Sequence, residues 1–80
     1  MEDKIINEVK EIINQQMDRS KDYKITPDMH LADDLSVDSL DAVEIIMEIE
    51  QRYDIEIPTE TALSIEHFSD ILDYLDENLK

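Results

Sequence analysis

The sequence predicts an all-α fold in one small domain. Apolar residues recur at helical spacing in three stretches, 80 residues suffice for one compact unit, and the single alternating run lacks a partner strand. That run, 55–57, ends at Pro58, so we expect an extended connection there. We expect one domain over residues 1–80, with helices at 3–17, 39–53, 59–64 and 67–79.

The first and last predicted helices are amphipathic. In each, apolar residues lie three, four and seven positions apart, which directs one face to a core. The core-facing residues of 3–17 are Ile5, Ile6, Val9, Ile12, Ile13 and Met17. Those of 67–79 are Phe68, Ile71, Leu72, Leu75 and Leu79.

The connection 18–38 is long for a compact domain, so it must be anchored or functional. Apolar residues spaced along it are the predicted anchors: Tyr23, Ile25, Met29, Leu31 and Leu35. The sequence at 26–28, TPD, predicts a brief helical turn. The chain contains no glycine, so its turns must use Asp, Asn, Ser, Pro or a strained backbone.

The helix 39–53 carries two apolar stripes. The first is typical of a core face and contains Ala42, Ile45, Ile46, Ile49 and Tyr53. The second, Leu40, Val43 and Met47, lies well round from it and is flanked by carboxylates: Asp41, Glu44, Glu48 and Glu50. We expect this stripe to be a docking surface. The alternative is that the connection 18–38 folds over the stripe and buries it, and both hold if the stripe is only partly covered.

The charge is strongly negative and unevenly distributed. The chain has 22 acidic and 7 basic residues, a net charge of -15. Sixteen acids and two bases lie in 25–80, a net of -14. The negative electrostatic field of these residues disfavours nucleic acid and anionic membranes as partners and favours basic protein surfaces. A charged face that only keeps the protein solvated explains the net charge equally well.

Features that the sequence lacks exclude further classes of protein. The chain has no cysteine, which excludes a disulfide framework and a zinc–thiolate site. No apolar run approaches the roughly 20 residues of a membrane span, and the first residues do not form a signal peptide. We expect a soluble, cytoplasmic monomer.

Ser39 follows Asp38 at the start of the helix 39–53. A helix cap is the simplest interpretation of this serine. A hydroxyl there is also a good attachment point for an anionic group, because free N–H groups and the helix dipole offset negative charge.

The sequence around Ser39 resembles the signature of acyl carrier proteins around their modified serine. The resemblance covers DDLSVDSLDAVE at 33–44, IIMEIE at 45–50, YDIEIP at 53–58 and DILDYL at 70–75. It extends over essentially the whole chain and implies a four-helix bundle. It also implies that the protein is a carrier and not an enzyme, with no catalytic residue and no metal site.

The resemblance implies that Ser39, flanked by Asp38 and Leu40, receives 4′-phosphopantetheine from coenzyme A through a separate Mg-dependent phosphopantetheinyl transferase. Acyl groups would then be held as thioesters during fatty acid or related acyl-chain biosynthesis. Acyl-processing enzymes with basic patches would bind the helix 39–53. By position, the acidic contacts are Asp38, Asp41, Glu44 and Glu50, and the apolar contacts are Leu40, Val43 and Met47. We expect Glu48, on the same helix, to belong to this partner-binding surface as well.

The chain departs from the pattern of its relatives at four positions. Ser36 replaces a glycine, and a positive φ there would strain the backbone. Thr59 and Thr61 replace acids, and Leu63 takes a position that is more often charged. A dedicated carrier for polyketide, lipid-modification or aminoacyl pathways is therefore an alternative.

Other classes of protein meet specific obstacles. A calcium-binding EF-hand loop starting at Asp33 fails, because Leu35, Val37 and Asp38 occupy two ligand positions and the glycine position. A hydrolase built on Ser39 needs a histidine base, and His30 and His67 lie in no recognisable motif. An acidic regulatory protein that binds a basic partner without a prosthetic group remains the alternative from another class.

Overall fold

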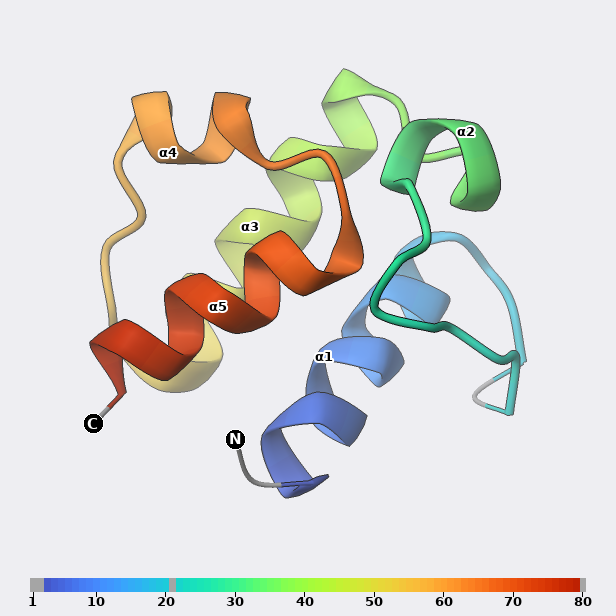
Figure 1. Cartoon of the computed structure of the whole chain (residues 1–80), viewed down its shortest axis with the longest axis horizontal. Helices are drawn as coiled ribbons and strands as arrows, with labels where there is room; N and C mark the ends of the chain where they lie inside the picture. The colour runs from blue at the N-terminus through green and yellow to red at the C-terminus, as the bar shows by residue number, and fades with distance from the viewer. Residues whose placement is uncertain (1–2, 21, 80) are drawn as a thin grey trace.

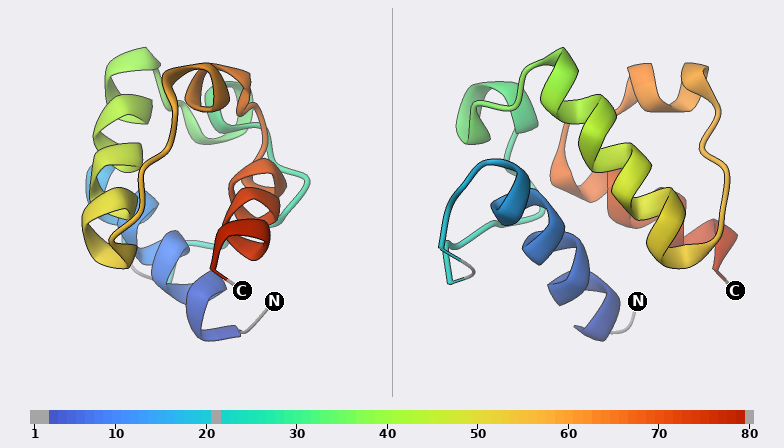
Figure 2. Two further views of the ribbon diagram at one scale, coloured as in Figure 1. Left: turned by 90° about the vertical axis from the view of Figure 1, so that its left-hand side faces the viewer. Right: turned by 180° about the vertical axis from the view of Figure 1, so that it is seen from behind.

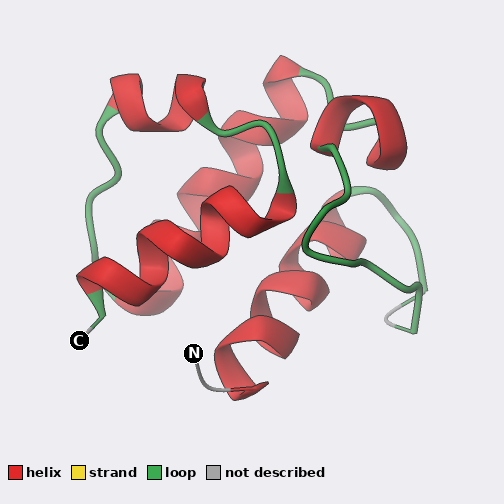
Figure 3. Ribbon diagram, in the orientation of Figure 1, coloured by secondary structure: helices red, strands yellow, loops and turns green. Residues whose placement is uncertain are grey.

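The computed structural model describes residues 3–20 and 22–79 and contains five helices among them (Figures 1 and 3). They are α1 (Asp3–Gln16), α2 (Leu31–Leu35), α3 (Ser39–Tyr53), α4 (Thr59–Ser64) and α5 (Phe68–Asn78). No strand occurs in these residues, so the all-α prediction is confirmed. None of the described helices has the length and apolar character needed to cross a membrane.

Four helices begin and end within one residue of the predicted bounds, whereas α2 was not predicted as a helix. The brief turn expected at 26–28 is present as a hydrogen-bonded turn, in which Met29 N–H donates to Thr26 O at 3.1 Å. The predicted extent of the domain, 1–80, includes Met1, Glu2, Lys21 and Lys80, which lie outside the described residues.

The core lies between α1, α3 and α5, which cross one another (Figure 2). Val9 and Ile13 of α1, Ile49 of α3, and Phe68 and Leu75 of α5 are completely buried. The remaining buried apolar residues are Ile12, Ile25, Leu31, Leu35, Val37, Ile45, Ile46, Ile57, Ile71 and Leu72. Burial of this set is the main stabilising contribution in a domain this small.

The connection between α1 and α3 is anchored by apolar side chains. Ile25, Leu31 and Leu35 are buried and Met29 packs partly against the core, as predicted. The prediction for Tyr23 is wrong, because its side chain is 41% exposed and lies under the Arg19 guanidinium at 4.8 Å. The anchored connection passes beside α1 and the start of α5 and does not cover the outer stripe of α3 (Figure 1).

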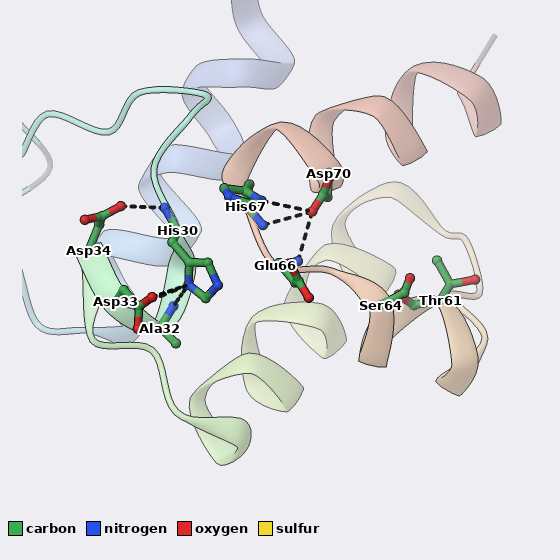
Figure 4. Close-up of polar contacts among 9 residues, drawn as sticks. All are labelled: His30, Ala32, Asp33, Asp34, Thr61, Ser64, Glu66, His67 and Asp70. Atoms are coloured by element: carbon green, nitrogen blue, oxygen red, sulfur yellow. Dashed lines mark hydrogen bonds and ion pairs between the residues drawn. The ribbon is translucent and has the colours of Figure 1, made fainter.

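An unusual cap starts α2 (Figure 4). The Nδ1 atom of His30 accepts hydrogen bonds from the N–H groups of Ala32 and Asp33, both at 3.2 Å. Asp34 reciprocates by accepting from the His30 N–H at 2.7 Å. Histidine is not among the residues that usually cap helices, which explains why the sequence did not predict α2.

The start of α2 is joined to the start of α5. Leu31 N–H donates to Glu66 O at 2.8 Å, and Phe68 N–H donates to Met29 O at 3.0 Å. Beside these bonds the rings of His30 and His67 meet edge to face, with centroids 5.1 Å apart. Backbone N–H groups of His67 and Glu66 donate to Asp70 (Figure 4) and hold the pKa of its carboxyl group below the usual value.

Ser36 ends α2 in the left-handed conformation, with φ 59° and ψ 29°. The chain adopts this positive φ without a glycine. A residue with a Cβ atom pays roughly 1–2 kcal/mol for this conformation. The strain is retained because the backbone N–H groups of Ser36 and Val37 bond to Ala32 O and Leu31 O, at 3.1 and 2.9 Å, and so turn the chain toward α3.

We predict that Ser36→Gly stabilises the fold by roughly 0.5–1 kcal/mol, the relieved strain less the extra entropy of glycine in the unfolded chain. Urea unfolding and the Tm would measure this gain. Ser36→Ala is the matched control, because it removes the hydroxyl but keeps the Cβ atom and should bring no gain. Equal stability of the glycine and alanine variants would contradict the strain argument.

We also predict that salt raises the Tm, because the net charge of -14 in residues 25–80 repels itself most strongly at low ionic strength. A thermal unfolding series in NaCl and MgCl₂ measures the slope. A variant with Asp73, Asp76 and Glu77 changed to amides should have a smaller slope. A Tm independent of salt in the parent chain would count against this explanation.

Candidate functional site

Asp38, and not Ser39, caps the N-terminus of α3. The Asp38 Oδ1 atom accepts from the Asp41 N–H at 2.8 Å, and Asp41 Oδ2 accepts from the Asp38 N–H at 3.4 Å. This reciprocal arrangement is a capping box. The simplest sequence interpretation of Ser39, a helix cap, is therefore wrong.

Ser39 is the first residue of α3, and its side chain is exposed. Its hydroxyl is not the helix cap, because the Asp38 side chain fills that role. The first N–H groups of a helix lack intrahelical acceptors and carry a partial positive charge. A phosphodiester on Ser39 would lie next to these groups, so the helix end fits an anionic attachment.

A cavity of about 430 Å³ opens beside Ser39 between α3 and α4. Asp38, Ser39 and His30 line it, together with Glu50, Thr59 and Glu66. The rest of its lining is apolar: Leu31, Ala32, Val37, Ala42, Val43, Ile46, Met47, Ile57, Ala62, Leu63 and Ile65. A largely apolar cavity next to the serine can shelter an aliphatic chain attached through it.

The outer stripe of α3 is exposed. Leu40, Val43 and Met47 are 66%, 54% and 51% accessible, so the alternative in which the connection 18–38 buries them is wrong. We call these three residues the exposed ridge of α3. An apolar ridge beside carboxylates is typical of a surface that binds a protein.

The predicted acidic contacts lie in different surroundings. Gln16 at the end of α1 donates from Nε2 to Glu44 Oε2 and, at 3.4 Å, to Asp41 Oδ1. Glu48 Oε1 lies 3.7 Å from Arg52 Nη2 on the same helix. Glu50 is half-buried in the cavity wall, where its carboxylate accepts from the Ile57 N–H at 2.8 Å. Glu50 therefore holds the chain after α3 in addition to any role toward a partner.

The two histidines do not form a hydrolase site. His30 uses Nδ1 to cap α2, and the His67 Nδ1 atom lies 3.7 Å from Asp70 Oδ2 at the start of α5. No group of three or more His, Asp and Glu side chains within the described residues is arranged to hold a metal ion.

The structure places three further residues at the cavity or at the acidic surface of α3, none of which the sequence assigned to the site. His30 lines the cavity, Gln16 binds two acids of α3, and Leu63 is 81% exposed at the cavity mouth. An apolar residue at a position more often charged was the signal available for Leu63. The sequence contained no comparable signal for His30 or Gln16.

Comparisons with known proteins agree with this geometry. The family profile described as "Phosphopantetheine attachment site" matches residues 3–75. An acyl carrier protein of Brachyspira hyodysenteriae is 42% identical over 76 residues, which cover 95% of this chain and 97% of the relative. One from Syntrophobacter fumaroxidans is 47% identical over 68 residues, which cover 85% of this chain and 83% of the relative.

A solved structure of a proposed acyl carrier protein from Mycobacterium tuberculosis has the same fold. Its TM-score is 0.82 at 29% sequence identity, with 90% of this chain and 96% of that chain covered. With a family profile that spans most of the sequence and relatives similar over nearly their full length, the chain belongs to the phosphopantetheine-attachment family of acyl carrier proteins.

Proposed function

We propose that Ser39 is the residue that receives the prosthetic group and that the chain carries acyl intermediates of fatty acid or related acyl-chain biosynthesis. As a member of its family the chain is a carrier and not an enzyme, and its prosthetic group is 4′-phosphopantetheine. The observation that carries the proposal is the exposed Ser39 hydroxyl at the first position of α3, with Asp38 already serving as the cap.

Each part of the site has a stated task in this proposal. Ser39 supplies the oxygen that forms the phosphodiester, and Asp38 keeps the helix start intact without using that oxygen. The prosthetic group supplies the terminal thiol that holds an acyl group as a thioester. The apolar walls of the cavity, including Val37 and Ile46, remove part of an aliphatic cargo from water.

The exposed ridge and its carboxylates are the proposed docking surface. The phosphopantetheinyl transferase and later acyl-processing enzymes would place apolar side chains on Leu40, Val43 and Met47 and basic side chains near Asp41, Glu44 and Glu48. The pathway stays open, because a dedicated carrier would use the same surface. Intact mass of the acylated protein from its own cell would identify the cargo and thereby the pathway.

We predict that incubation with coenzyme A, Mg²⁺ and a phosphopantetheinyl transferase adds one phosphopantetheine group, measured by intact mass. Ser39→Ala should remain unmodified. Ser36→Ala is the matched control, because Ser36 is a second exposed serine three residues away and its variant should be modified normally. Modification of Ser39→Ala would assign the attachment to another residue, and an unmodified parent would favour the acidic regulatory alternative.

We predict that Glu44→Gln and Glu48→Gln each raise the KM of the transferase for this protein by roughly two- to fivefold at low salt. The acids steer a basic enzyme, so the effect should shrink in high salt. Asp73→Asn and Asp76→Asn on α5 are charge-matched controls with exposed side chains and should leave the KM unchanged. An equal increase in all four variants would mean that net charge, and not this surface, governs binding.

A further inference from the structure

Leu63 on α4 is the most exposed of the large apolar side chains in the described residues, at 81%. It lines the mouth of the same cavity as Val43 and Met47 of the exposed ridge. Exposed apolar side chains from two helices thus surround one opening, which also contains Ser39. Tyr23, the other large apolar residue exposed outside this surface, lies in the connection between α1 and α2.

Leu63 and Ser39 lie near each other at one end of the molecule, because both line the same cavity. Helix α4 and the start of α3 lie at the same end of the molecule in all three views (Figures 1 and 2). An enzyme that reaches the Ser39 hydroxyl therefore comes close to α4. Burial of an exposed leucine in that contact is favourable if the enzyme offers an apolar surface.

The two helices present different chemistry around the opening. On α3 the apolar ridge is flanked by Asp41, Glu44 and Glu48, whereas α4 contains one acid, Glu60, beside neutral threonines and a serine. The complementary partner is basic opposite α3 and apolar opposite α4. A second copy of this chain does not fit, because it would bring the same carboxylates face to face.

We propose that Leu63 is a docking residue that enters an apolar pocket on the enzyme acting at Ser39, next to a basic surface that contacts α3. The inference rests on the proposed attachment at Ser39 and extends the docking surface from α3 to α4. Leu63 determines partner specificity, because a partner with a basic side chain at this point would meet an apolar residue where an acid is needed.

The test measures transferase kinetics on the full chain, with the carrier as varied substrate. Leu63→Gln should raise the KM roughly 10- to 100-fold with little change in kcat, since a buried leucine contributes about that much to affinity. Leu63→Met retains an apolar side chain and should stay within about twofold of the parent. Tyr23→Gln removes an exposed aromatic residue outside the surface and should not change the KM.

Folding and self-association are measured on the same proteins. Because Leu63 is exposed and glutamine is a good helix former, the Tm of Leu63→Gln should match that of the parent. A parental KM in a folded, normally loaded Leu63→Gln variant would overturn the docking role alone. A dimer of the parent that is lost in this variant would assign the surface to a second copy. A parent that never gains the prosthetic group would overturn the proposed function, and the docking role with it.

Discussion

The capping box between Asp38 and Asp41 is the interaction on which the site depends. It caps the N-terminus of α3 with the side chains of Asp38 and Asp41, so Ser39, at the first helical position, is not needed as the cap. If Ser39 itself were the cap, its oxygen would accept a backbone hydrogen bond, and modification of that oxygen would remove the cap of α3. The separation of the cap from the proposed attachment point would let the chain carry a group on Ser39 without losing the start of α3.

The second constraint is the geometry of the long connection before α3. It contains no glycine, yet the chain turns through a left-handed Ser36 between α2 and α3. The cost is tolerated because α2 is fixed from the other side, by its His30 cap and by the backbone hydrogen bonds to the start of α5. Leu31 and Leu35 then enter the core, which leaves the outer stripe of α3 uncovered.

The surface combines two kinds of interaction around one opening. In the proposed docking, carboxylates along α3 would orient a basic partner at a distance, whereas the exposed ridge and Leu63 would act only on contact. Glu50 differs from the other acids, because its hydrogen bond to Ile57 fixes the segment that leads to α4. Helix α4 and the cavity wall are thus positioned by a residue that sequence reasoning assigned to partner binding.

The sequence by itself determined the all-α class, the bounds of α1, α3, α4 and α5, and the core faces, because helical periodicity in apolar residues is a local signal. It also indicated Ser39 and the second stripe of α3. Only the tertiary structure decided that this stripe stays exposed, that Tyr23 remains outside the core, and that His30, Gln16 and Leu63 lie near the site. These outcomes depend on contacts between segments far apart in the chain, and no local pattern encodes which distant side chain fills a position or leaves it open to water.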